Sequence, residues 1–200
     1  MELADAVARR RMVRSFSGHP VPTGQLERVL QLACTAPSAG NTGGWDAVVL
    51  TGPETAVFWD ATTTPEWRAR SRRWPGLERA PVVVALFVDP DAYVARYAEA
   101  DKAGSGLGEG VDAWPVPYWY VDGAFAALLM LLAASDTGLG ACLLGNFRGE
   151  GELRAALGVP PGRRYVGAVA MGPAGGDDPP SSSAARGRRR PSRVVHQGRW

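Results

Sequence analysis

Cysteine and histidine are scarce in this sequence. The two cysteines, Cys34 and Cys142, lie far apart and form no C-x-x-C pair, which excludes a disulfide framework and a cysteine-rich zinc site. The two histidines, His19 and His196, lie in proline- or arginine-rich stretches and belong to no H-E-x-x-H pattern. We therefore predict no metal site and no histidine-based catalysis, and we expect reduced thiols in a cytoplasmic protein.

Several common motifs are also missing. No G-x-G-x-x-G follows a predicted strand and no G-x-x-x-x-G-K-[ST] occurs, which argues against a Rossmann dinucleotide domain and against a P-loop. The nucleophile elbow of hydrolases, G-x-S-x-G, is absent as well. The longest apolar run, residues 124–134, is too short to span a bilayer, so we expect no membrane partner.

Lysine is almost absent, because Lys102 is the only one among 22 basic residues. Ten arginines lie in residues 9–14 and 186–200, which contain no acidic residue, so the rest of the chain is acidic overall. Arginine binds phosphate through paired hydrogen bonds, so these two segments could form an anion site. The alternative is a solvated basic helix end. The basic tail lacks the interleaved aromatic residues of a nucleic-acid arm, so we expect no nucleic-acid partner.

The hydrophobic patterning predicts an α+β or mixed α/β chain that forms a single domain over 1–200. Helices are expected over 2–11, 91–103, 122–136 and 151–157, and over an amphipathic segment that begins at an N-cap, Thr23, and ends by Pro37. Strands are expected over 47–50, 81–88, 141–144 and 165–171. Residues 51–80 give no clear pattern.

Two segments suggest an assembly of chains. The helix expected over 122–136 is apolar all round, so it is either central in the fold or buried by a partner chain, and we predict an obligate homodimer. Residues 172–187 have the composition of a flexible linker, which leads to a C-terminal arm over 188–200. The acidic pair Asp177–Asp178 falls in this linker and is expected to be solvated.

Four segments, in order along the chain, resemble the nitroreductase family of flavoproteins. Residues 10–16 (R-R-M-V-R-S-F) resemble its R-R-S-V-R-x-F opening, and residues 36–45 (A-P-S-A-G-N-T-G-G-W) resemble its A-P-S-x-x-N-x-Q-P-W loop. Residues 138–142 (G-L-G-A-C) resemble its G-L-G-[ST]-C turn, and residues 188–196 resemble its closing R-R-P-L-E-E-V-V-H segment. Each match is weak alone, but together they are specific for the family.

The resemblance implies an α+β fold with a central antiparallel sheet flanked by helices, in an intertwined homodimer with FMN bound between the chains. It implies that Arg10 and Arg14 hold the phosphate and ribityl chain, with Arg11 and Met12 at the same turn. Arg188 and Arg189 of the arm would close on the phosphate. The remaining implied contacts are Ser38 and Asn41 from the loop, and Cys142, Leu143, Leu144 and Gly145 along the isoalloxazine ring.

This sequence departs from the family pattern in places. Met12 replaces a serine, Gly43-Gly44 replace Gln-Pro, and Ser192-Arg193-Val194 replace Leu-Glu-Glu. The first two changes remove a hydroxyl and an amide near the flavin, so they bear on flavin affinity or substrate choice rather than on the fold.

The function that the resemblance implies is transfer of hydride from NAD(P)H through the flavin to an electron-poor acceptor, such as a nitroaromatic or a quinone. The flavin carries the chemistry, so no catalytic side chain is assigned. An aromatic cluster could form a wall that stacks a small planar substrate, or it could be packing in the core or dimer. Its members are Trp114, Tyr118, Trp119 and Tyr120. Two alternatives remain: a flavin-dependent oxidase or dehydrogenase of a specialised metabolite (an azoline or cyclic dipeptide), and a flavin-binding protein without turnover.

Overall fold

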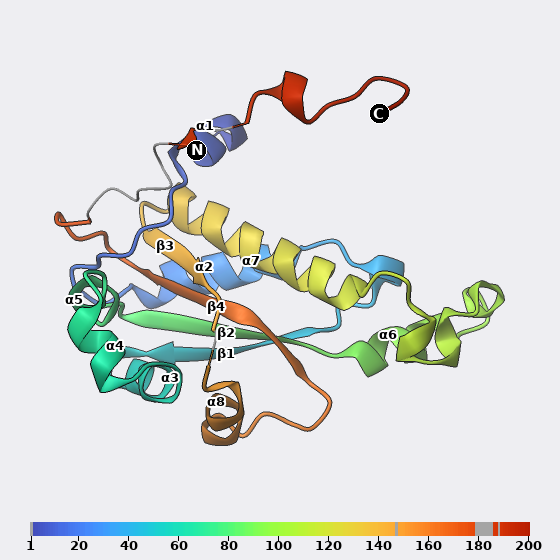
Figure 1. The fold of residues 1–200 in the computed structure, drawn as a ribbon, viewed down its shortest axis with the longest axis horizontal. Coiled ribbons are helices and arrows are strands. Elements are labelled where there is room, and N and C mark those ends of the chain that lie inside the picture. Colours follow the sequence, from blue (N-terminus) through green and yellow to red (C-terminus); the bar gives the residue numbers. More distant parts are fainter. Residues whose placement is uncertain (1, 147, 179–185, 188) are drawn as a thin grey trace.

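The structure is a computed structural model that describes residues 2–146, 148–178, 186–187 and 189–200 (Figure 1). Its helices are α1 (Leu3–Arg9), α2 (Thr23–Ala33), α3 (Thr55–Thr62), α4 (Pro65–Arg70), α5 (Trp74–Leu77), α6 (Pro90–Tyr97), α7 (Tyr118–Asp136) and α8 (Glu150–Ala156). Its strands are β1 (Trp45–Thr51), β2 (Val82–Val88), β3 (Gly140–Leu144) and β4 (Arg164–Gly172). Short 3-10 turns connect several of these elements, among them Ala39–Asn41.

The four strands form one antiparallel sheet in the order β1-β2-β4-β3, with helices on both faces (Figure 1). Every residue of β2 is buried, since side chains of successive residues point to opposite faces and both faces are covered. On one face, Val84 packs in a cluster with side chains of α7 and α2. On the other face, Val83 packs with side chains of α3, α5 and α8. The expected α+β class and flanked antiparallel sheet are confirmed.

The sequence predicted all four strands to within two residues of their observed ends. The three helices between β1 and β2 were not predicted, because each is at most eight residues long and prolines begin α4 and interrupt α5. Two helix predictions were wrong in detail. Thr23 is the first residue of α2 and makes no side-chain cap, and α6 ends at Tyr97 rather than near 103, where short 3-10 turns follow.

α7 packs on the sheet with one face and exposes the other. It begins at Tyr118, four residues before the predicted start, and Ala127 and Met130 are buried against the sheet. A Cβ on Gly123 would lie 2.8 Å from a methyl group of Val88, so the glycine lets the helix approach β2 closely. Phe125 and Leu128 remain 41% and 47% exposed. By length and hydropathy α7 alone among the described helices could cross a membrane, but half of that window is buried in the fold, as in core helices.

The segment expected to be a linker is anchored over its first seven residues. Gly172 ends β4, Ala174 forms a bridge with Phe16, and the backbone N–H of Gly175 donates to the carbonyl of Ser15 at 2.8 Å. Composition cannot reveal such pairing with a distant part of the chain. Residues 179–185 of the expected linker lie outside the described residues. The described residues from 186 onwards are all exposed, and this arm leads away from the body beyond α1 (Figure 1).

Candidate cofactor-binding site

The arginine-rich turn after α1 lies beside the start of β3. Met12 and Ala141 form a parallel bridge, and the backbone N–H of Val13 donates to the carbonyl of Ala141 at 3.0 Å. A Cβ on Gly140 would lie 2.8 Å from a methyl group of Val13, so a glycine is needed for this close approach. The structure thus brings together the first and third of the family-like segments, which are far apart in the sequence.

The turn presents guanidinium groups that form few hydrogen bonds with the described part of the chain. The Nη1 atom of Arg10 is buried, and among the described residues it has no hydrogen-bond partner. Arg14 donates from Nη1 to the carbonyl of Met12 at 3.2 Å, and Arg11 is exposed. Arg10 and Arg11 also line a small cavity of about 130 Å³. A buried donor without an acceptor is costly, and an anion such as phosphate would satisfy it, so these residues fit the FMN phosphate.

Two aspartates hold this turn in place. Asp178 accepts a hydrogen bond from the backbone N–H of Arg14 at 3.1 Å and lies 3.8 Å from Nη1 of Arg73. Asp177 accepts from the hydroxyl of Ser15 and from Arg79, and these bonds, the serine's first, lower the pKa of its carboxyl. The interpretation of this acidic pair as merely solvated was wrong. Neither contact could be predicted from local sequence, because the partners lie roughly 100 to 160 residues away.

At the end of β3 the thiol of Cys142 is buried, whereas the residues that follow it are accessible. The side chain of Cys142 is fully buried in the core, and this burial raises the pKa of its thiol to about 12. Leu143 is 36% exposed, Leu144 is half-buried, and nothing lies within 4 Å of the position that a Cβ on Gly145 would take. Of the four residues predicted to follow the flavin ring, the last three therefore present a surface.

A buried carboxylate anchors the loop that is predicted to face the flavin. Asp122, which is 2% exposed, accepts hydrogen bonds from the backbone N–H of Ala39 and from the hydroxyl of Tyr93, both at 2.8 Å. Ser38 accepts from the backbone N–H of Gly43 at 2.8 Å, while Asn41 has a φ of 55°, a left-handed conformation that asparagine tolerates.

This loop and the arginine turn lie at opposite ends of α7. Asp122 contacts the loop, whereas Ser135 contacts the carbonyl of Ala6 in α1, and the thirteen-residue separation along the helix corresponds to about 20 Å. Within this chain, therefore, Ser38 and Asn41 line a different pocket from Arg10. Arg189 is exposed in the arm, and Arg188 lies outside the described residues.

The predicted aromatic wall divides into two pairs. Trp114 and Trp119 are 7% and 3% exposed and pack edge-on against Tyr93, with ring centroids 5.8 and 6.1 Å away. Both belong to the core, which was the alternative interpretation. Tyr118 and Tyr120 are 44% and 37% exposed, so of the four residues these two remain accessible to a ligand.

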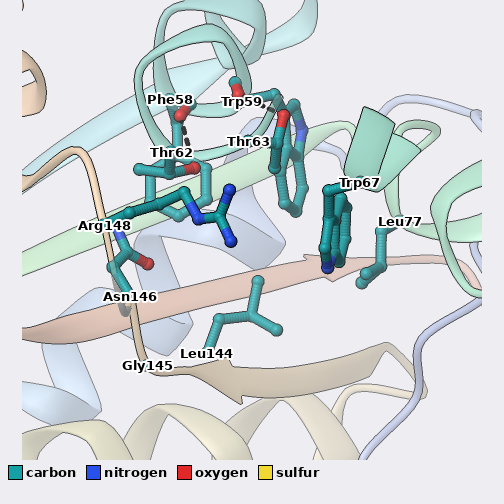
Figure 2. Close-up of a pocket in the computed structure, with 10 residues that line it drawn as sticks. All are labelled: Phe58, Trp59, Thr62, Thr63, Trp67, Leu77, Leu144, Gly145, Asn146 and Arg148. Atoms are coloured by element: carbon teal, nitrogen blue, oxygen red, sulfur yellow. Dashed lines mark hydrogen bonds between the residues drawn. The ribbon is translucent and has the colours of Figure 1, made fainter. Parts of the chain in front are cut away.

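A pocket that the sequence did not indicate opens at the end of β3 (Figure 2). It has a volume of about 210 Å³, and its wall comes mostly from the helices between β1 and β2. The lining residues are Phe58, Trp59, Thr62, Thr63, Trp67, Leu77, Leu144, Gly145, Asn146 and Arg148. The scattered tryptophans of residues 51–80 were the only available signal, and they had no recognisable period.

Comparison with known proteins identifies the family of this chain. Residues 7–173 match the profile of the Nitroreductase family. An NADH dehydrogenase of Thermus thermophilus is 29% identical over 190 residues, which cover 86% of each protein. A provisionally named NADH dehydrogenase/NAD(P)H nitroreductase of Archaeoglobus fulgidus is 26% identical, covering 96% of this chain and 94% of that protein.

Solved structures show the same fold. A provisionally assigned nitroreductase from Desulfovibrio desulfuricans, crystallised in complex with FMN, superposes with a TM-score of 0.72 at 20% identity, covering 100% of this chain and 98% of that one. A nitroreductase family protein from Streptococcus pneumoniae has the same TM-score at 17% identity, covering 98% and 100%. Since the family profile matches most of the sequence, the chain belongs to the nitroreductase family of oxidoreductases.

Proposed function

We propose that the protein is an FMN-dependent oxidoreductase that takes electrons from NAD(P)H and delivers them to an electron-poor acceptor, such as a quinone or nitroaromatic. The observation that carries this proposal is the buried Nη1 atom of Arg10, which has no hydrogen-bond partner among the described residues. It lies in the turn that, by resemblance to the family, would hold the flavin phosphate. The names of the Thermus and Archaeoglobus relatives, and the FMN bound to the Desulfovibrio protein, support the same cofactor pair.

The chain's own residues would hold and orient the cofactor. Arg10 and Arg14 would pair with the phosphate, while Asp178 fixes the backbone of Arg14 and so aims the turn. The surface of Leu143 to Gly145 would support the isoalloxazine ring. Bound FMN supplies two-electron chemistry, with hydride entering from NAD(P)H and leaving to the acceptor. For a quinone, the balance is NAD(P)H, one proton and quinone giving NAD(P)⁺ and hydroquinone.

A second copy of the chain would complete the site. The ends of α7 are too far apart for one protomer to supply both the arginine turn and the Ser38–Asn41 loop, but an antiparallel pair of α7 helices would bring each loop to the other chain's turn. The exposed residues Phe125 and Leu128 offer an apolar face for this pairing. Arg189, in an arm that leaves the body, would then reach a phosphate held by the other chain.

The absorption spectrum of the purified protein tests this function. We expect a yellow protein that anaerobic NADH or NADPH bleaches and that menadione or nitrofurazone reoxidises. A colourless protein that takes up no FMN refutes the proposal. A yellow protein that neither nicotinamide bleaches indicates flavin binding without this activity. If an azoline or cyclic dipeptide reduces the flavin in place of NAD(P)H, with consumption of oxygen, the protein is instead an oxidase or dehydrogenase of such a metabolite.

A further inference from the structure

The pocket at the end of β3 has a rigid aromatic wall (Figure 2). Trp59 of α3 and Trp67 of α4 both meet the ring of Trp74 edge-on, with centroids 5.5 and 6.0 Å away. The guanidinium of Arg68 lies 4.5 Å over Trp74 and donates to Asp60 at 2.6 Å, which braces the wall from behind. Such a wall offers a flat apolar surface to a planar ligand without the entropic cost of ordering it.

The polar groups of the pocket are mostly donors without acceptors. The indole Nε1 of Trp59 and the Nδ2 of Asn146 are buried, and among the described residues neither has a hydrogen-bond partner. The hydroxyls of Thr62 and Thr63 donate to the carbonyls of Phe58 and Trp59, at 2.7 and 2.6 Å, so they are used within α3. An acceptor-rich ligand would therefore be favoured over one that donates.

Arg148 adds a positive charge to this donor set. Figure 2 shows its guanidinium reaching across the pocket towards the rings of Trp59 and Trp67. None of the described residues forms a hydrogen bond or an ion pair with it. It acts weakly through space on the exposed carboxyl of Glu66, whose pKa is lowered first by hydrogen bonds from its own backbone and from Thr64. A cation aimed into an aromatic pocket, with donors beside it, is complementary to an aromatic anion.

We propose that this pocket binds a planar aromatic acid, with its ring against Trp59 and Trp67 and its carboxylate paired with Arg148. The inference rests on the proposed function, because Leu144 and Gly145 line the pocket and are also among the residues expected to contact the isoalloxazine ring. An aromatic acceptor seated here would lie beside the flavin ring. The acid group thus defines the substrate class of the enzyme: electron-poor aromatics that carry a carboxylate.

A pair of matched acceptors tests the preference. We would compare 4-nitrobenzoate with its methyl ester in NAD(P)H-dependent turnover of the holoenzyme, using Arg148→Gln and, as control, Arg70→Gln, which removes an exposed arginine of α4 outside the pocket. Loss of a charged hydrogen bond should lower kcat/KM for the acid about tenfold in the Arg148 variant and leave the ester within about twofold. The control should change neither. An unchanged acid-to-ester ratio in Arg148→Gln overturns the proposal.

A binding measurement separates this inference from the proposed function. Benzoate has no reducible group, so its binding to the purified protein, followed by calorimetry, does not depend on turnover. We expect saturable binding that weakens about tenfold in Arg148→Gln and is retained in Arg70→Gln. If NADH and NADPH fail to bleach the flavin but benzoate binds in this way, the proposed function is wrong and the assignment of the pocket to an aromatic acid is supported. If Arg148→Gln instead weakens FMN binding and leaves benzoate binding unchanged, the guanidinium serves the cofactor and the inference is wrong.

Discussion

Replacing Arg10 by methionine should have opposite effects on the empty and the FMN-bound protein. The Nη1 atom of Arg10 is buried and has no hydrogen-bond partner among the described residues, so the empty protein carries a desolvated donor there. Methionine fills similar space without the donor. The free energy of unfolding of the apoprotein should stay the same or rise by about 1 kcal/mol.

The FMN complex should lose affinity. Removal of one charged hydrogen-bonding partner of the phosphate costs about 1.5–3 kcal/mol, which corresponds to roughly 10- to 100-fold in Kd. FMN at 100 times the wild-type Kd stabilises the wild type by about 2.7 kcal/mol, and the same concentration would stabilise the Arg10 variant by only about 0.4–1.4 kcal/mol. For a chain of this length the wild-type Tm should therefore rise by about 5–11 °C, and that of the variant by about 1–6 °C.

Flavin titrations and thermal melts with and without FMN measure both effects. Arg70→Met is the matched control, because Arg70 is exposed in α4 and does not line the cavity beside Arg10. The substitution removes the same charge without removing a buried donor. Riboflavin, which lacks the phosphate, should bind weakly to wild type and respond little to the Arg10 change. Equal FMN affinity in wild type and the Arg10 variant, or an equal loss for riboflavin, would refute the assignment of Arg10 to the phosphate.

Four other outcomes are expected. Arg189→Ala should also weaken FMN binding about 10- to 100-fold, and its effect should not add to that of the Arg10 change. If FMN affinity stays intact and the salt dependence of DNA binding becomes smaller, the tail is instead a nucleic-acid arm. Phe125→Glu should give a monomer in light scattering that has lost FMN, and a dimer that keeps FMN would contradict pairing through α7. Cys142→Ala should keep most activity at pH 7–9, because a thiol with a pKa of about 12 stays protonated there, and full loss of activity with FMN still bound would reveal a thiol mechanism. Ellman's reagent should label the exposed Cys34 and spare Cys142.

The elements of the fold follow closely from local sequence. The β-branched run that forms β2 is buried on both faces, and its composition alone predicts a central strand. The apolar helix α7 was predicted because its residues are hydrophobic whichever way they face. The order of the family-like segments predicted the family, since each segment keeps its own short pattern of arginines and glycines. Local patterns suffice for these features because each depends on residues close together in the chain.

The site depended on tertiary structure. From sequence, Asp177 and Asp178 were expected to be solvated residues of a linker. In the structure they accept hydrogen bonds from Ser15 and Arg14, which lie more than 160 positions away. The sequence does not distinguish the burial of Trp114 and Trp119 from that of Tyr118 and Tyr120. In the structure the two tryptophans are buried against Tyr93, whereas the two tyrosines stay exposed. The pocket around Arg148 joins three short helices to the end of a strand. Sequence periodicity records which face of an element is apolar, but only the packed chain decides which distant side chains meet and which donors are left without a partner.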